Sequence, residues 1–253
     1  MHGRNAALIR RYFPTYRSPK LRYQALLDGL VASDTLWLDL GCGRRICADD
    51  ALNNALPHRA QLAVGADADP YLRGHDSMRN LVRCDASALP FRDGAFNLVT
   101  SSFVFEHLER PEAVLREVAR VCRPGGRIAI LTPNLANYGM IVAAATPYRF
   151  HRWYKKVVYY LGRGDWIDHD EDMFPTYYRA NTVGRLRKLS REAALEVERL
   201  ERLNMAHSFG FIKPLYIASL LFERLIDRRV LETFKADILG VFVRGWADKR
   251  SET

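Results

Sequence analysis

The stretch Leu36-Trp37-Leu38-Asp39-Leu40-Gly41-Cys42-Gly43 is the most informative segment of this chain. Its apolar run is typical of a parallel strand that is buried on both faces of a sheet. The two glycines after the run allow a tight turn and let the main chain come close to a bound molecule. Because ligands of open α/β sheets bind beyond the carboxyl ends of the strands, the stretch predicts an α/β fold and the position of its pocket.

The rest of the chain alternates between strand-like and helix-like segments. Pro111 and Glu112 suit the first turn of a helix, which we expect to end at the turn Pro124-Gly125-Gly126. The pattern predicts a doubly wound, mostly parallel seven-stranded sheet with helices on both faces. Strands are expected at 35–40, 61–67, 80–84, 95–101, 127–132, 195–203 and 235–243, and further helices at 21–31, 46–56, 183–193 and 215–228.

The alternation breaks at residues 134–182, which are rich in aromatic and basic side chains. We interpret this segment as an insertion after the fifth strand that caps the pocket. Residues 1–34 are expected to form a basic arm and a helix, and residues 35–253 the main domain. A chain of 253 residues, 48% hydrophobic and 26% charged, fits one large domain with an insertion better than two independent domains.

Composition also limits where the protein works. We expect no signal peptide, because no apolar region follows the basic start, and no apolar run approaches the roughly 20 residues that span a bilayer. The cysteines form no C-x-x-C pair, so we expect reduced thiols in a cytoplasmic protein. They are Cys42, Cys47, Cys84 and Cys122.

The net charge of +9 is concentrated in three basic clusters, at residues 4–22, 149–156 and 179–191. Such clusters favour an anionic partner, either a phosphate, an acidic lipid surface or a nucleic acid. The alternative is a solvated basic surface. No segment resembles an RNA-binding appendage, so a nucleic-acid partner is not expected.

Three of the expected strands end at or just before an aspartate, namely Asp39, Asp67 and Asp85. Each carboxylate can accept several hydrogen bonds. Asp67 is placed to accept from both hydroxyls of a ribose, Asp85 from the amino group of an adenine, and Asp39 from an ammonium group. An adenosine with an amino-acid tail would use all three, whereas the alternative for each is to cap the next helix.

These motifs resemble those of the class I S-adenosylmethionine-dependent methyltransferases, methyltransferase type 11-like. The resemblance is strong over residues 35–134 and weak over the last two strands. Within 35–134 the matching segments are 39–45, 64–70, 84–91, 96–108 and 115–126. It implies a Rossmann-like fold and S-adenosylmethionine as cofactor. The cofactor-binding residues that it implies are Asp39, Gly41, Cys42, Gly43, Asp67, Ala68, Asp85, Ala86 and Ser102.

Two positions depart from the family pattern. Arg45 stands where the third glycine of the first motif is usual, and Asn97 where an aspartate is frequent. The missing third glycine also weighs against a nicotinamide-dependent dehydrogenase, whose fingerprint needs G-x-G-x-x-G to bind a pyrophosphate.

His107 is the candidate catalytic residue, as a base or as a group that positions the acceptor. Its alternative is a histidine satisfied by backbone bonds at a helix start, and Glu106 either orients it or faces solvent. Glu106-His107 also resembles a segment of ubiquinone-pathway O-methyltransferases that can bind a divalent metal. That segment has an acid where this chain has Phe103, so we expect no metal.

The expected reaction is O-methylation of a sugar, glycan or other small-molecule hydroxyl, because the aromatic insertion can stack on a ring. A cluster of acids and a histidine at 168–172 is a second candidate zone, or else a solvated loop. The fold alone does not fix the acceptor, and the oligomeric state stays open.

Two alternatives remain for the function. The basic arm and the amphipathic segment 211–228 could hold the protein at the inner face of an anionic membrane, near a lipid-linked acceptor. Leu215, Leu220, Leu221 and Leu225 would otherwise pack on the sheet. The other alternative is a non-catalytic module that only binds the cofactor.

Overall fold

The computed structural model describes residues 2–69, 74–138, 175–205, 213–228 and 230–246. The chain forms two compact units. Unit 1 consists of Met1–Ser18, Asn134–Pro175 and Arg202–Asp237, and unit 2 of Pro19–Pro133, Thr176–Glu201 and Ile238–Thr253. The domain boundaries expected from the sequence stay predictions. Most of the expected insertion, including 168–172, lies outside the described residues.

A seven-stranded sheet with the order β3-β2-β1-β4-β5-β7-β6 forms the centre of unit 2. The sheet is parallel from β3 through β5 and has one antiparallel pair at its edge, which confirms the predicted fold class. The strand order reverses between β1 and β4, and ligands of open α/β sheets bind at such a switch point. The strands are β1 (Leu36–Leu40), β2 (Leu62–Asp67), β3 (Asn80–Arg83), β4 (Phe96–Ser102), β5 (Cys122–Pro133), β6 (Leu195–Leu203) and β7 (Asp237–Arg244).

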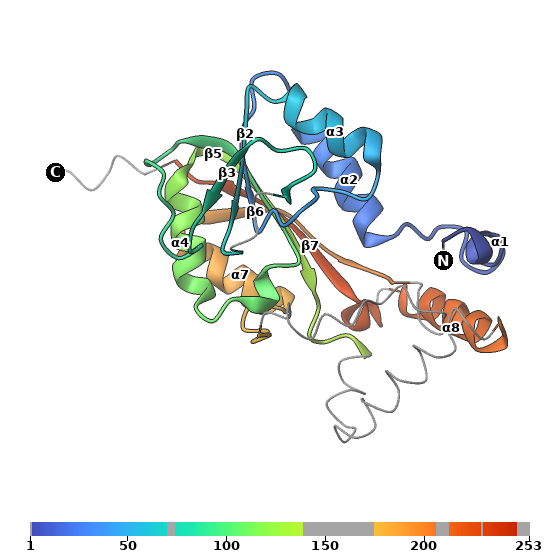
Figure 1. The fold of residues 1–253 in the computed structure, drawn as a ribbon. Helices are drawn as coiled ribbons and strands as arrows, with labels where there is room; N and C mark the ends of the chain where they lie inside the picture. The colour runs from blue at the N-terminus through green and yellow to red at the C-terminus, as the bar shows by residue number, and fades with distance from the viewer. Residues whose placement is uncertain (1, 70–73, 139–174, 206–212, 229, 247–253) are drawn as a thin grey trace. The chain divides into compact units, whose positions relative to one another are not determined.

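Helices cover both faces of this sheet (Figure 1). α2 (Pro19–Leu30) and α3 (Asp50–Arg59) lie on one face, and α4 (Pro111–Val121) and α7 (Val183–Glu192) on the other. α4 begins with a proline in its first turn, as predicted, and buries the apolar stripe expected for it. That stripe joins the strands in a core that includes Leu38, Val99, Val114, Leu115, Val118, Ile128, Ile130 and Leu186.

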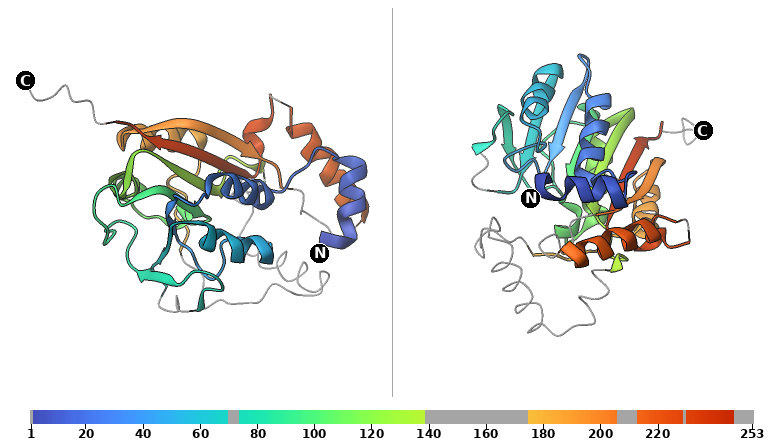
Figure 2. Two further views of the ribbon diagram at one scale, coloured as in Figure 1. Left: turned by 90° about the horizontal axis from the view of Figure 1, so that it is seen from above. Right: turned by 90° about the vertical axis from the view of Figure 1, so that its right-hand side faces the viewer.

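Unit 1 contains the helix pair α1 (His2–Tyr12) and α8 (Lys213–Ile226) and the short 3-10 helix η3 (Glu232–Phe234). α1 and α8 lie side by side in each view (Figure 2). Phe13 and Tyr16 pack against Tyr216 and Leu220 in a small apolar cluster. No helix in the described part of the chain is both long enough and apolar enough to cross a bilayer.

Most of the expected elements begin and end within two residues of the observed ones, but three expectations were wrong. The start of the chain was expected to be a basic arm, yet α1 forms there. The helix expected to end before Pro57 runs to Arg59 and begins only at Asp50, because the Asp49 side chain accepts from Leu52 N and caps it.

The third difference concerns the turn Pro124-Gly125-Gly126, which lies inside β5 rather than before it. The pairing of β4 with β5 shifts register between Phe96 and Leu98, so the extra residues form a bulge. Gly125 has a φ of +76°.

All four cysteines are free.

Candidate cofactor site

A cavity of about 310 Å³ lies at the carboxyl end of β1 in unit 2. This volume is at the lower end of the range for small-molecule sites. Three structural elements supply its walls: the glycine turn after β1, the segment after β4, and one face of α2. The lining residues are Lys20, Tyr23, Gln24, Asp39, Gly41, Cys42, Arg45, Ile46, Cys47, Ala48, Ser102 and Phe103.

Asp39 is the buried acid of this cavity, with 6% of the residue exposed. Its Oδ1 accepts a hydrogen bond of 2.5 Å from the Thr100 hydroxyl, and that hydroxyl oxygen in turn accepts one of 2.7 Å from Trp37 Nε1. Burial raises the pKa of Asp39 to about 7, against the hydrogen bond from Thr100, and the charge of Asp67 raises it further. The role expected for Asp39, to accept from an ammonium group, stays a prediction.

The glycine turn links the end of β1 to the end of β2. Gly41 has a φ of +69°, its N–H donates to Ala66 O at 2.7 Å, and a Cβ there would lie 2.1 Å from Val104 Cγ2. Gly43 has a φ of +52°, and its N–H donates to Asp67 Oδ2 at 2.8 Å. The turn therefore needs glycine at residue 41 and fixes the carboxylate of Asp67 from one side.

The other predicted cofactor residues do not line this cavity. Asp67 Oδ1 accepts from Asp69 N at 3.0 Å, and Ala68 O accepts from Arg83 Nε at 3.3 Å. Asp85 Oδ1 accepts from the backbone and the hydroxyl of Ser87 at 2.7 and 2.9 Å, and these bonds lower the pKa of Asp85.

Ala86 packs against the core of the sheet. The structure thus brings Asp39, Gly41, Cys42 and Ser102 together around one cavity. It connects Gly43 and Asp67 to them by a hydrogen bond. The cofactor contacts of all these residues stay predictions.

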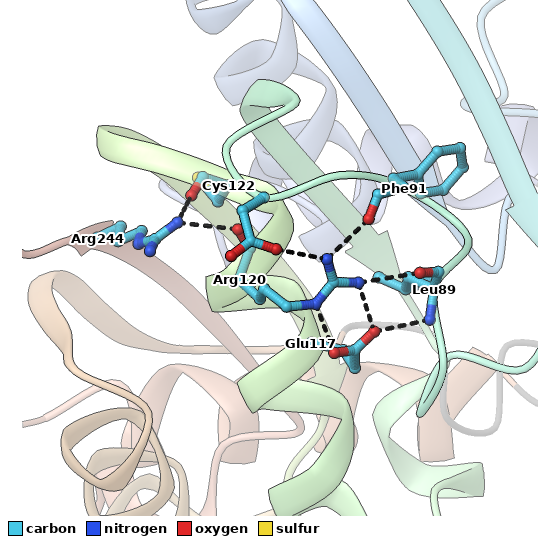
Figure 3. Close-up of polar contacts among 7 residues, drawn as sticks. Leu89, Phe91, Glu117, Arg120, Cys122 and Arg244 are labelled. Atoms are coloured by element: carbon cyan, nitrogen blue, oxygen red, sulfur yellow. Dashed lines mark hydrogen bonds and ion pairs between the residues drawn. The ribbon is translucent and has the colours of Figure 1, made fainter.

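A web of hydrogen bonds holds the loop that carries Asp85 (Figure 3). The Arg120 guanidinium donates to both oxygens of Glu117, to Phe91 O at 2.7 Å and to Leu89 O at 2.9 Å. Leu89 N donates to Glu117 Oε2 at 2.8 Å. Arg244 donates to the carbonyl oxygens of Arg120 and Cys122, which ties β7 to the end of α4. The loop after β3 is therefore fastened to α4 by charge-assisted bonds.

Sequence reasoning missed the contribution of α2 to the cavity. Lys20, Tyr23 and Gln24 all line it, and their spacing places them on one face of the helix. That spacing was a signal available in the sequence. The Tyr23 hydroxyl is fully buried beside Asp39, and burial together with the charge of Asp39 raises its pKa.

His107 lies in the 3-10 helix η2 (Phe105–His107), just after β4, and does not line the cavity. Its neighbour Glu106 is buried and accepts from the Thr132 hydroxyl at 3.2 Å, so the alternative in which Glu106 faces solvent was wrong. Asn181 Nδ2 donates to the same hydroxyl at 2.7 Å. Burial raises the pKa of Glu106, and the charge of His107 lowers it.

The two departures from the family pattern have structural explanations. Arg45 forms ion pairs with Asp50 and Asp76 at the edge of the cavity. Asn97 Oδ1 accepts from Leu36 N at 2.8 Å, and its Nδ2 donates to Asp34 O at 3.0 Å. Asn97 thus fastens β4 to the start of β1. Within the described residues, no group of three or more His, Cys, Asp or Glu side chains could hold a metal ion.

Comparison with known proteins finds similarity to methyltransferases. Residues 38–130 match the model of a methyltransferase domain. The ubiquinone/menaquinone biosynthesis C-methyltransferase of Roseobacter denitrificans is 40% identical over 73 residues, which are 29% of this chain and 25% of that protein. The demethylmenaquinone methyltransferase of Mycobacterium marinum is 38% identical over 94 residues, which are 37% and 39% of the two chains.

The chain therefore spans between a quarter and two-fifths of the length of these two relatives. Solved structures extend the similarity of fold. An S-adenosylmethionine-dependent methyltransferase of Mesorhizobium loti has a TM-score of 0.53 at 17% identity, over 90% of this chain and 98% of that one.

A geranyl diphosphate C-methyltransferase of Streptomyces coelicolor, solved with S-adenosyl-L-homocysteine, has a TM-score of 0.50 at 13% identity, over 88% and 78% of the two chains. Such low identities show a common fold. The family match over residues 38–130 supports a class I methyltransferase domain with S-adenosylmethionine as its cofactor, and the solved structures show that this chain shares the fold of such domains.

Proposed function

We propose that this chain transfers the methyl group of S-adenosylmethionine to a small acceptor molecule. The observation that carries the proposal is the buried carboxylate of Asp39 beside a cavity at the switch point of the sheet. The residues present fit the cofactor. Asp39 would accept from the ammonium of its amino-acid tail. The turn that lines the cavity beside Asp39 needs glycine at residue 41, because a Cβ there would collide with Val104.

The bound cofactor supplies an electrophilic methyl group and a thioether that leaves without charge. Catalysis therefore depends mainly on how the chain aligns the acceptor with that methyl group. The acceptor atom also loses a proton, and His107 is our candidate base for this step. Glu106 directly precedes His107 in η2, and its carboxylate accepts a hydrogen bond from the Thr132 hydroxyl. We propose that Glu106 helps to orient His107.

The similar proteins favour one class of acceptor. The two curated relatives are named for methylation in ubiquinone or menaquinone biosynthesis, and the Roseobacter protein is named as a C-methyltransferase. We therefore propose a ring carbon of a quinone-type compound as the first candidate acceptor.

The hydroxyl of a sugar or glycan is the second candidate. It depends on the aromatic segment 134–182, most of which lies outside the described residues. A base near the methyl group serves both reactions, since a ring carbon and a hydroxyl oxygen each lose a proton when they are methylated.

A transfer assay tests the proposal. The purified chain is incubated with methyl-labelled S-adenosylmethionine and, separately, with a reduced demethylnaphthoquinone, a panel of sugars and glycans, or no acceptor. We expect label in the naphthoquinone only, attached through carbon as judged by mass spectrometry. His107→Gln is expected to lower turnover by roughly 100-fold and to leave the affinity for S-adenosylhomocysteine unchanged.

Label in a sugar hydroxyl would replace the first candidate acceptor with the second. Binding of S-adenosylhomocysteine without transfer to either class of acceptor would contradict the proposed activity, and would favour a module that only binds the cofactor.

A further inference from the structure

The solvent-facing side of α8 is apolar. Leu215, Leu221, Phe222 and Leu225 are 42%, 49%, 42% and 41% exposed. Their spacing, with Ala218 among them, places them in one stripe along the helix. The expectation that the leucines of this segment pack on the sheet was wrong, because only Leu220 is buried and it packs in the cluster of unit 1. Most amphipathic helices of globular proteins expose their polar side, so this helix needs a different explanation.

The opposite side of α8 is anchored within unit 1. Tyr216 and Leu220 pack on the cluster with Phe13 and Tyr16, which follow α1. Glu223 is buried, and its Oε1 accepts a hydrogen bond of 2.6 Å from the Tyr138 hydroxyl. Its backbone carbonyl accepts one of 2.7 Å from Asn204 Nδ2. A rotation of α8 that buried its exposed leucines would break these contacts.

The exposed apolar side chains are concentrated in this unit. Among the residues that the structure describes, eleven large apolar side chains are exposed, and seven of them belong to unit 1. Scattered apolar side chains are normal on a protein surface, but a contiguous patch marks a site of interaction. Four of the seven exposed apolar side chains of unit 1 lie on α8, and the other three are Leu135, Met205 and Val230.

The charged side chains that α1 and α8 expose are positive. α1 has no acidic residue, and its last turn carries Arg10 and Arg11. On and just after α8, Lys213, Arg224 and Arg228 are exposed.

The acids of unit 1 within the described residues are already paired or buried. Lys235 pairs with Asp227 at 2.8 Å, Arg202 pairs with Glu232 at 3.2 Å, and Glu223 and Asp237 are buried. The surface of the helix pair therefore combines an apolar stripe with a net positive charge.

We propose that the α1–α8 helix pair docks on an anionic lipid bilayer. Leu215, Leu221, Phe222 and Leu225 enter the boundary between headgroups and acyl chains, and the arginines of both helices meet the lipid phosphates. This combination of an apolar stripe and basic flanks is the one that interfacial helices use. A protein partner would need its own acidic groups around an apolar groove, whereas an anionic bilayer offers both features over any area. The inference is independent of the acceptor proposed above.

Co-sedimentation of the full chain with vesicles tests this inference. One set of vesicles is phosphatidylcholine, and the other contains about a third phosphatidylglycerol. We expect binding to the anionic vesicles and little to the neutral ones, and weaker binding at high salt because screening reduces the attraction.

Leu221→Ser with Leu225→Ser is expected to lower the vesicle partition coefficient at least ~10-fold. Arg224→Gln with Arg228→Gln is expected to lower it several-fold and to reduce the salt dependence.

A matched control is Leu62→Ser in β2, which removes a leucine that is 40% exposed in unit 2. It is expected to leave vesicle binding unchanged. The leucine variants are also expected to keep the wild-type affinity for S-adenosylhomocysteine, which separates this test from that of the proposed function. Equal binding by wild type and the double leucine variant, or no binding by the wild type, would overturn the inference. So would a dimer that the double variant dissociates in the absence of lipid.

Discussion

Replacement of Asp39 by asparagine should have opposite effects on stability and on ligand binding. Burial raises the pKa of this carboxyl from 3.8 to about 7. The folded state therefore binds the proton more tightly than the unfolded state does. Well below pH 4 the carboxyl is protonated in both states and does not lower the free energy of unfolding. The free energy of unfolding then falls as the pH rises from about 4 to about 7. A pKa raised from 3.8 to about 7 corresponds to a free-energy cost of about 4 kcal/mol above pH 7.

The asparagine side chain would stay neutral at every pH and would still accept from the Thr100 hydroxyl. For Asp39→Asn we therefore expect a free energy of unfolding that is higher than that of wild type by up to about 4 kcal/mol at pH 8. At pH 4 we expect the two to be nearly equal. The ligand effect has the other sign. Loss of a charge-assisted hydrogen bond to the ammonium of the cofactor should weaken binding of S-adenosylhomocysteine by roughly 10- to 100-fold.

Urea denaturation at both pH values measures the first effect, and isothermal titration calorimetry measures the second. Calorimetry in two buffers of different ionisation enthalpy adds a further check. A cation beside Asp39 lowers its pKa, so binding to the wild type should release a proton below about pH 7, and binding to the variant should not.

The matched control is Asp49→Asn, because Asp49 is an exposed helix cap that accepts from Leu52 N, and asparagine caps equally well. It should change neither quantity. A less stable Asp39→Asn protein at pH 8 with unchanged affinity for S-adenosylhomocysteine would contradict both expectations for Asp39.

Four further substitutions test the turn, the loop and the core. Gly41→Ala places a Cβ 2.1 Å from Val104 Cγ2 and should abolish binding of S-adenosylhomocysteine in calorimetry. The Cβ of Gly43→Ala meets nothing within 4 Å, so this variant should cost only about 1–3 kcal/mol of backbone strain. Equal affinity in both variants would contradict this. Arg120→Ala removes the donor that holds the loop after β3 and should lower the free energy of unfolding by about 2–3 kcal/mol in urea, so an unchanged midpoint would exclude that role. Leu186→Ala should cost about 2–5 kcal/mol in the same assay, and a loss below about 1 kcal/mol would show that its side chain is not in the core.

The central strands could be predicted from the sequence because they are buried on both faces. Such strands are continuous apolar runs, and β1, β2 and β4 were all found within one residue of their expected bounds. α1 could not be predicted in the same way. Its apolar side chains are few and lie among arginines, and its packing partner, α8, begins about 200 residues later in the chain.

The site shows the same division. The glycines and acids at the strand ends were visible in the sequence, because tight turns and carboxylates have few substitutes. The chain of hydrogen bonds from Trp37 through Thr100 to Asp39 was not visible, because it depends on how β1 and β4 pair. The Arg120 web depends on how α4 packs beside the loop after β3. Local sequence patterns reveal neither the pairing of β1 with β4 nor the packing of α4 beside this loop.

Titration of the wild-type chain with S-adenosylhomocysteine in a calorimeter tests directly whether the ends of the central strands bind the cofactor. We predict saturable binding of one molecule per chain, weakened at least ~10-fold by Asp39→Asn. A folded wild-type chain that gives no saturable heat at millimolar ligand would contradict the claim that the ends of the central strands hold this cofactor.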